Sequence, residues 1–134
     1  MDEPIRKLWE EFRNDPKNYD LRNRLIKHYS PLVHRRADRI HAELNDDKIN
    51  RDDLVSIGYF GLIDAINNFD PDGGVTFEAY SLPRIHGAIM DEIRELDWLP
   101  RLIRARMNRM NKENNPDSTE TGPEDREGRD GEQG

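Results

Sequence analysis

The most informative part of the chain reads Asp53-Leu-Val-Ser-Ile-Gly-Tyr-Phe-Gly-Leu-Ile-Asp-Ala-Ile-Asn-Asn-Phe-Asp70. Its small and apolar residues return every three or four positions, which is the repeat of one helix face. This face consists of Leu54, Gly58, Gly61, Leu62, Ala65 and Phe69. Asn50 is a candidate N-cap, and Asp53 follows in the first turn, where the helix dipole favours negative charge. The stretch is therefore predicted to be a helix that packs by one face.

Helical spacing also marks the segments before this stretch. Apolar residues recur between Ile5 and Phe12, and Asn14-Asp-Pro16 then predicts the end of a helix. A longer pattern runs from Leu21 to Leu44 and contains Pro31. Because proline lacks a backbone donor, a kink is predicted near Ser30.

The segment after the stretch begins with a turn, Asp70-Pro-Asp-Gly-Gly74, and Thr76 follows as a candidate cap. The next helix is predicted to carry an apolar face of Tyr80, Ile85, Ala88, Ile89, Ile93 and Leu96. Pro100 is predicted to open a last short helix that ends near Met110. Because no segment alternates as a strand does, the predicted fold is an all-α, irregular helical domain.

Composition divides the chain into a domain and a tail. The last 24 residues, 111–134, carry eight acids and three bases and no apolar side chain larger than a proline ring, so they cannot bury a core. Residues 1–110 hold 20 acidic and 18 basic side chains, so most of the formal charge of −7 belongs to the tail. We predict a helical domain over 1–110 and a disordered acidic tail over 111–134.

Charge, cysteine content and hydropathy limit the function classes. A nearly neutral domain does not hold duplex DNA by bulk charge alone, although four arginines gather between Leu99 and Met110. The absence of cysteine removes disulfides, thiolate catalysis and cysteine metal sites. No apolar run approaches the roughly 18 residues of a membrane helix, and the N-terminus is acidic where a signal peptide is basic. The predicted location is the cytoplasm, with no membrane partner.

Several motifs agree in order and spacing with one known family. The stretch Asp53–Asp70 is followed by Phe77-Glu-Ala-Tyr80, then by Arg84-Ile-His-Gly-Ala-Ile-Met-Asp-Glu-Ile-Arg94 and by Asp97-Trp-Leu-Pro-Arg101. This series resembles region 2 of bacterial RNA polymerase sigma factors, in particular the flagellar and sporulation group of the sigma-70 family. The resemblance covers Ile5 to Met107. It implies an all-α sigma region 2 fold and a role in transcription initiation.

The resemblance implies a polymerase-docking surface on the helix of the first motif. In sigma factors this helix docks on the clamp coiled coil of the largest subunit of core RNA polymerase. The positions that match are Asp53, Ser56, Ile57, Tyr59 and Phe60. Taken singly, Phe60 or Ile63 is more simply a core residue, because large apolar side chains are mostly buried. An apolar patch rimmed by polar groups instead marks a partner site.

The next helix of the family reads the minus-ten promoter element. The positions carried over are Arg84, His86, Gly87, Asp91 and Arg94, with His86 standing where the family has arginine. A glycine inside a helix costs about 1 kcal/mol relative to alanine and permits close approach of a backbone or phosphate chain. A mixed-charge face is otherwise simply solvated.

Two aromatic residues precede that face, Phe77 and Tyr80. Unstacked bases regain roughly 1–3 kcal/mol each by stacking on such rings. For Phe77, next to the cap, a core role is favoured, whereas for Tyr80 base capture and core packing are equally supported. The family also places Trp98, Arg101 and Arg104 near the upstream edge of the minus-ten element, where arginine pairs with phosphates or guanine edges. Trp98 is alternatively a core residue.

Other chemistries are poorly supported. His28, His34 and His41 are six and seven positions apart, which does not match the i, i+4 spacing of a helical zinc site. A calcium loop starting at Asp70 needs glutamate at its twelfth position, where Ser81 stands. We expect no catalytic residue, no metal and no cofactor, and hence no enzyme.

Two function hypotheses remain. The first is a sigma-like initiation protein that binds core RNA polymerase and recognises and melts the minus-ten element. The second is an interaction module, truncated before regions 3 and 4, that occupies core polymerase or binds an anti-sigma factor without productive initiation.

Overall fold

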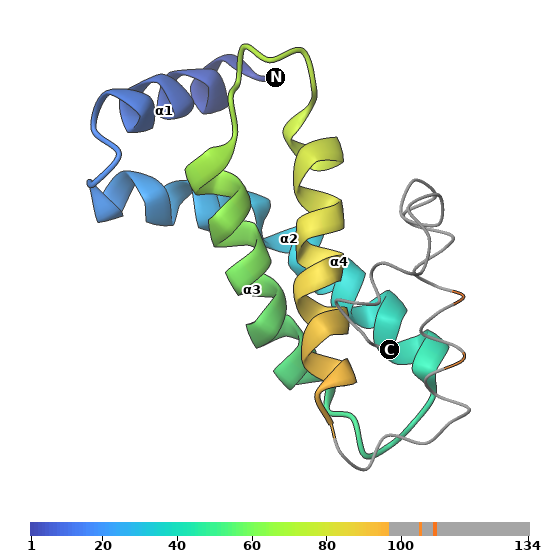
Figure 1. Ribbon diagram of the computed structural model, residues 1–134. Helices are drawn as coiled ribbons and strands as arrows, with labels where there is room; N and C mark the ends of the chain where they lie inside the picture. The colour runs from blue at the N-terminus through green and yellow to red at the C-terminus, as the bar shows by residue number, and fades with distance from the viewer. Residues whose placement is uncertain (97–104, 106–108, 110–134) are drawn as a thin grey trace. The chain divides into compact units, whose positions relative to one another are not determined.

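The computed structural model describes residues 1–96, 105 and 109, and residues 1–96 contain four α-helices and no strand. The helices are α1 (Glu3–Asn14), α2 (Tyr19–Leu44), α3 (Arg51–Asn68) and α4 (Phe77–Arg94). The helices α3 and α4 run side by side, and α2 crosses them (Figure 1). The predicted all-α fold is confirmed.

The chain divides into two compact units, Met1–Glu95 and Leu96–Gly134. In the second unit, the structure describes little beyond Ala105 and Arg109, both helical and exposed. The predicted domain boundary at residue 110 and the predicted disordered tail lie outside the described residues and stay predictions.

Side-chain caps start three of the helices. The Asn18 side-chain oxygen accepts hydrogen bonds from the Asp20 and Leu21 amides at the start of α2, and Asn50 does the same at the start of α3. The Thr76 hydroxyl accepts from the Ala79 amide at 3.1 Å. Each cap satisfies backbone donors that have no partner within the helix. The caps predicted at Asn50 and Thr76 are confirmed.

An aromatic cluster joins α1 to the rest of the domain. Trp9 is 1% exposed, and its indole N–H donates to the Tyr29 hydroxyl at 3.1 Å. Its ring centroid lies 5.2 Å from that of Phe69 and 5.4 Å from that of Phe77. Burial raises the pKa of the Tyr29 hydroxyl. The single indole therefore connects α1 to α2, to the end of α3 and to the start of α4.

Glycine brings the backbones of α3 and α4 together. A Cβ atom on Gly61 would lie 2.5 Å from the Arg84 carbonyl oxygen and 2.7 Å from the Ile85 Cα. A Cβ on Gly58 would lie 2.9 Å from a Val33 side-chain carbon of α2. Distances under 3.0 Å are too short for a real Cβ, so only glycine allows this packing. The predicted inner face of α3 is buried along its length.

The helix α2 continues through Pro31, whose neighbours Leu32 and Val33 are buried. The Ser30 hydroxyl donates to the Lys27 carbonyl at 3.0 Å. Within the described part of the chain, no helix has both the length and the hydropathy that crossing a membrane requires.

Candidate functional site

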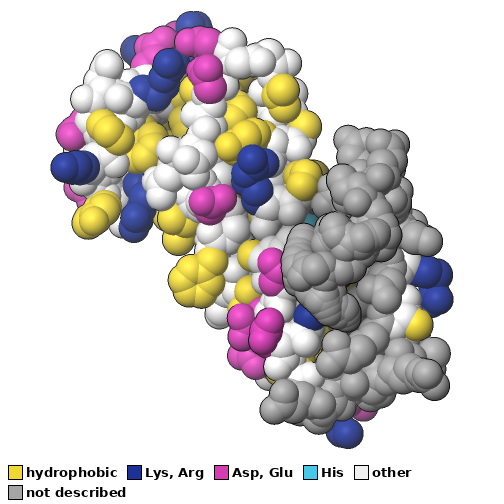
Figure 2. Space-filling model, in the orientation of Figure 1, with side chains coloured by type: hydrophobic (Ala, Val, Ile, Leu, Met, Phe, Trp, Pro, Cys, Tyr) yellow, Lys and Arg dark blue, Asp and Glu magenta, His cyan; other side chains and the backbone are white. Residues whose placement is uncertain are grey.

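The outer face of α3 exposes a large aromatic side chain. Phe60 is 70% exposed, and Asp53 and Ser56 on the same face are also exposed. Ile57 and Tyr59 are half-buried at the edges of this face. Figure 2 shows hydrophobic and acidic side chains next to one another over α3. The interpretation of Phe60 as a core residue is therefore wrong, and the structure supports the alternative of an exposed apolar site.

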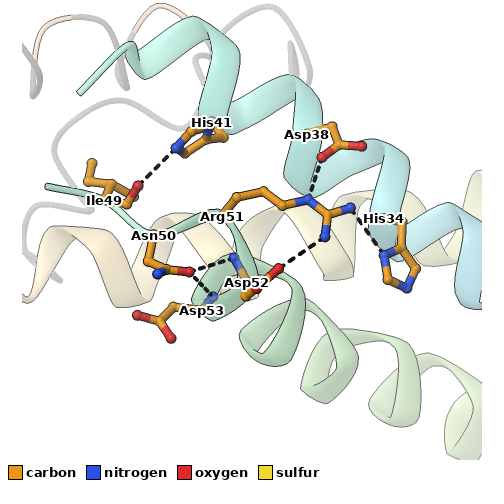
Figure 3. A network of polar contacts seen from close by, with 8 residues as sticks. All are labelled: His34, Asp38, His41, Ile49, Asn50, Arg51, Asp52 and Asp53. Carbon is orange, nitrogen blue, oxygen red and sulfur yellow. Dashed lines mark hydrogen bonds and ion pairs between the residues drawn. The ribbon is translucent and has the colours of Figure 1, made fainter. Parts of the chain in front are cut away.

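A polar network joins the start of α3 to α2 (Figure 3). The Arg51 guanidinium lies 2.6 Å from Asp38, 3.2 Å from Asp52 and 3.3 Å from Nδ1 of His34. The Arg51 hydrogen bond holds the pKa of Asp38 below its ordinary value. The His34 imidazole also contacts α3 through its other nitrogen, since its Nε2 lies 3.3 Å from the Tyr59 hydroxyl.

This network is not predicted by the sequence. His34, Asp38 and Arg51 were not predicted as site residues. The spacing of His34 and Asp38 places both on one face of α2. No local pattern indicates that Arg51, far along the chain, meets that face.

The outer face of α4 carries four of the predicted DNA-binding positions. Arg84 and Asp91 are exposed, and Gly87 and Arg94 are half-buried. The Arg94 guanidinium lies 3.4 Å from the Asp91 carboxylate. A Cβ on Gly87 would meet no atom of the described residues within 4 Å. The space that a close ligand needs is therefore open at Gly87, as its predicted role requires.

Tyr80 lies at the edge of this face, and its side chain contacts Arg84, Asn68 and Phe69. The Arg84 guanidinium lies 3.8 Å from the ring centroid and donates to the Tyr80 carbonyl at 2.8 Å. The Tyr80 hydroxyl donates to the Asn68 carbonyl at 3.2 Å, and the ring centroid lies 5.3 Å from that of Phe69. Tyr80 thus combines core packing with a surface position, next to an arginine.

Two predicted DNA-binding residues are buried. Phe77 is 1% exposed because it packs against Trp9, Phe69 and Tyr29, whose ring centroid lies 4.2 Å away. His86 is 2% exposed, and among the residues that the structure describes neither of its ring nitrogens has a hydrogen-bond partner. The expectation that these side chains face DNA is corrected, and the core role favoured for Phe77 is confirmed.

The buried arc of α4 is wider than the sequence predicted. Ser81, His86 and Met90 are buried beside the predicted apolar face, whereas Ala88 and Leu96 are half-buried. The reason is that α4 packs against both α2 and α3. Burial, followed by the positive charges of Arg36, Arg94 and Arg39, lowers the pKa of His86 to about 4.

Three predicted site residues, Trp98, Arg101 and Arg104, lie outside the described residues. Among residues 1–96, 105 and 109, no group of three histidine, aspartate or glutamate side chains could hold a metal ion. In the turn after α3, Asp72 pairs with Arg13 of α1 at 2.9 Å and Asp70 lies 3.9 Å from the same guanidinium. These two carboxylates therefore connect the turn to α1.

The comparisons with known proteins agree with this geometry. The family model described as Sigma-70 region 2 matches residues 25–99, which include most of α2 and all of α3 and α4. The chain belongs to the sigma-70 region 2 family.

Three relatives illustrate the similarity. The RNA polymerase sigma-D factor of Bacillus subtilis is 42% identical over 98 residues, which is 73% of this chain and 37% of that protein. The RNA polymerase sigma factor FliA of Yersinia enterocolitica is 39% identical over 83 residues, 62% of this chain and 36% of the relative. For FliA of Salmonella typhimurium the values are 39% over 80 residues, 60% and 33%. The chain spans about a third of the length of these curated relatives.

Proposed function

We propose that this chain is a sigma-type transcription initiation protein, which binds core RNA polymerase through the outer face of α3 and the minus-ten promoter element through the outer face of α4. The observation that carries the proposal is the exposure of Phe60, at 70%, on a helix whose inner face is fully packed. The similarity to the RNA polymerase sigma-D factor and to the sigma factor FliA supports it. This role is one of binding, without catalysis, and places the protein beside polymerase in the cytoplasm.

The chemistry of the α3 face suggests what it would contact. The exposed ring of Phe60 lies between the exposed carboxylates of Asp53 and Asp64. Burial of the ring against a partner removes apolar surface from water, and the carboxylates favour a partner with positive charge around an apolar pocket. We propose the clamp coiled coil of the largest polymerase subunit as this partner.

The α4 face offers different chemistry. Arg84 is exposed beside Tyr80 and next to the open position at Gly87. Arginine pairs with phosphate and stacks on planar rings, and tyrosine stacks on unpaired bases. This combination supports contact with single-stranded minus-ten DNA once the promoter opens.

A titration with core RNA polymerase tests the docking step. The labelled chain is titrated with polymerase and binding is followed by fluorescence anisotropy, for wild type and for Phe60→Ala. An interface aromatic at a hot spot contributes at least about 2 kcal/mol, so the variant should bind about 30-fold more weakly. Tyr19→Ala is the matched control, because Tyr19 is 66% exposed at the start of α2, outside the proposed surface. Absence of binding by the folded wild type would refute the proposal.

A second experiment tests promoter engagement. Minus-ten oligonucleotides that carry 2-aminopurine report unstacking in the presence of polymerase and the chain. We expect fluorescence to rise with wild type and to rise less with Tyr80→Ala. An unchanged response in a folded Tyr80→Ala variant would remove Tyr80 from the mechanism.

The alternative function is an interaction module that occupies core polymerase or binds an anti-sigma factor without opening DNA. The near balance of 20 acidic and 18 basic residues over 1–110 favours it, because bulk charge then contributes little to DNA affinity. Tight polymerase binding with no 2-aminopurine response would select this alternative.

A further inference from the structure

The network at the start of α3 determines which nitrogen of His34 carries a proton. The Arg51 guanidinium lies 3.3 Å from His34 Nδ1. A guanidinium has five N–H donors and no acceptor, so Nδ1 must be the acceptor in this contact. The imidazole that accepts at Nδ1 is neutral and carries its hydrogen on Nε2.

The second nitrogen therefore acts as a donor. His34 Nε2 lies 3.3 Å from the Tyr59 hydroxyl oxygen, and its N–H donates to that oxygen. The rings meet edge to face, with centroids 6.1 Å apart and an interplanar angle of 84°. Tyr59 does not use its own hydroxyl hydrogen in this contact. Among the described residues, His34 is the one hydrogen-bond partner of that hydroxyl.

Two carboxylates hold the arginine that imposes this arrangement. Asp38 lies 2.6 Å from Arg51 Nε, and Asp52 lies 3.2 Å from Nη1, so the third nitrogen, Nη2, faces His34 (Figure 3). Since charge-assisted hydrogen bonds to a planar guanidinium also fix its orientation, the direction of the His34 contact follows from these ion pairs. The order of donors runs from Arg51 through His34 to Tyr59.

We propose that His34 is a positioning residue of the polymerase-docking surface, which orients the Tyr59 hydroxyl as a donor toward a hydrogen-bond acceptor of the polymerase. The acceptor is a carboxylate or a backbone carbonyl oxygen. The inference rests on the proposed function, because Tyr59 lies at the edge of the face that exposes Phe60. It extends the docking surface from α3 to α2.

Affinities for core RNA polymerase test the inference through four variants. Tyr59→Phe removes the donor, and His34→Phe keeps a ring but removes both polar contacts. One intramolecular or interface hydrogen bond is worth about 0.5–1.5 kcal/mol, so Tyr59→Phe and His34→Phe should each weaken binding about 3- to 10-fold. The double variant should be no weaker than Tyr59→Phe alone. His34→Gln, whose amide offers an acceptor to Arg51 and a donor to Tyr59, should restore most of the affinity.

The controls separate the inference from the proposed function. Phe60→Ala reports docking by α3, and Lys27→Ala changes an exposed α2 side chain outside the network. Wild-type affinity for His34→Phe, or multiplicative losses in the double variant, would overturn the inference while Phe60→Ala still weakens binding. If wild type does not bind, or Phe60→Ala has no effect, the proposed function fails and the inference fails with it.

Nitrogen NMR of the free protein is an independent measurement. At pH 8, the ¹⁵N spectrum of the His34 ring should show a protonated Nε2 and an unprotonated Nδ1. The opposite tautomer would overturn the inference without any use of polymerase. Arg51→Gln should mix the two tautomers, because the donor that selects the first is then weaker.

Discussion

The outer faces of α3 and α4 each present an aromatic ring, but the two rings differ in their internal contacts. Phe60 on α3 is 70% exposed. Tyr80 on α4 lies under the Arg84 guanidinium, 3.8 Å from its centroid, and its hydroxyl is bonded to the Asn68 carbonyl. A partner that covers the Phe60 ring can do so without breaking contacts inside the domain. A base that stacks on Tyr80 must share or replace contacts that already exist.

The two faces therefore differ in how far they are preorganised for binding. The outer face of α3 is preorganised because α2 and α4 pack closely against the inner face of the same helix. Gly58 and Gly61 permit this close packing. On the α4 face, the charged side chain of Arg84 covers the Tyr80 ring. We therefore expect docking to need little rearrangement and base capture to need more.

The largest effect on stability should come from truncating a buried aromatic ring, compared with truncating an exposed one. Phe77→Ala should lower the free energy of unfolding by about 3–5 kcal/mol, because Phe77 is packed within the aromatic cluster. Phe60→Ala should change it by less than about 0.5 kcal/mol. Urea unfolding of both variants measures the contrast, and equal losses would contradict the assignment of Phe77 to the core and Phe60 to the surface.

Acidification should lower the stability of the folded domain, because His86 is buried in its neutral form on α4. Its pKa in the fold is lowered to about 4 from an ordinary 6.5, so the neutral form is favoured in the folded state. The stability that this contributes is present above pH 6.5 and is lost as pH falls toward 4, by up to about 3 kcal/mol.

Unfolding midpoints between pH 7 and pH 4 measure this loss, and His86→Leu serves as the control because leucine does not titrate. The slope of stability against pH should be steeper for wild type than for the variant across this window. Parallel profiles would show that His86 is not the titrating group.

The close contact of α3 and α4 can be tested with two glycines. Gly61→Ala places a Cβ against the α4 backbone and should destabilise the domain by about 1–3 kcal/mol. Gly87→Ala enters open space and should stabilise α4 by about 0.5–1 kcal/mol, since alanine favours the helix. Thermal unfolding measures both, and a neutral Gly61→Ala would disprove the close backbone contact.

The smallest effect on stability should come from the contact between the Arg84 guanidinium and the Tyr80 ring. Arg84→Gln removes the guanidinium from the ring, and a double-mutant cycle with Tyr80→Leu should give a coupling energy of about 0.5–1 kcal/mol. Urea unfolding of the four proteins measures the coupling. A coupling energy near zero would mean that the contact between Arg84 and the Tyr80 ring does not stabilise the domain. The α4 face would then be as well preorganised for binding as the α3 face.

Much of the fold follows from local signals in the sequence. The caps at Asn50 and Thr76, the helix end near Asn14 and the inner face of α3 are all read correctly, because each depends on residues within a few positions of one another. The predicted polymerase-docking and promoter positions came from the resemblance to sigma region 2. Their contacts with partners stay predictions.

Burial on α4 was not predictable in the same way. His86 and Met90 lie beside the apolar face expected from periodicity, yet both are buried. Periodicity locates the centre of a buried face but not its width, which depends on how many helices pack against it. Here two helices do, and the second one, α2, comes from a part of the chain far from α4.

The four helices and the inward position of the small residues of α3 follow from the sequence alone, because helix signals and glycine spacing are local properties of the chain. The packing of the helices against one another leaves Phe60 exposed and buries Phe77 and His86. The same packing brings Arg51 to His34 and His34 to Tyr59. The physical reason is that exposure and hydrogen-bond direction depend on neighbours supplied by other helices, 17 positions away for His34 and Arg51 and 25 for His34 and Tyr59.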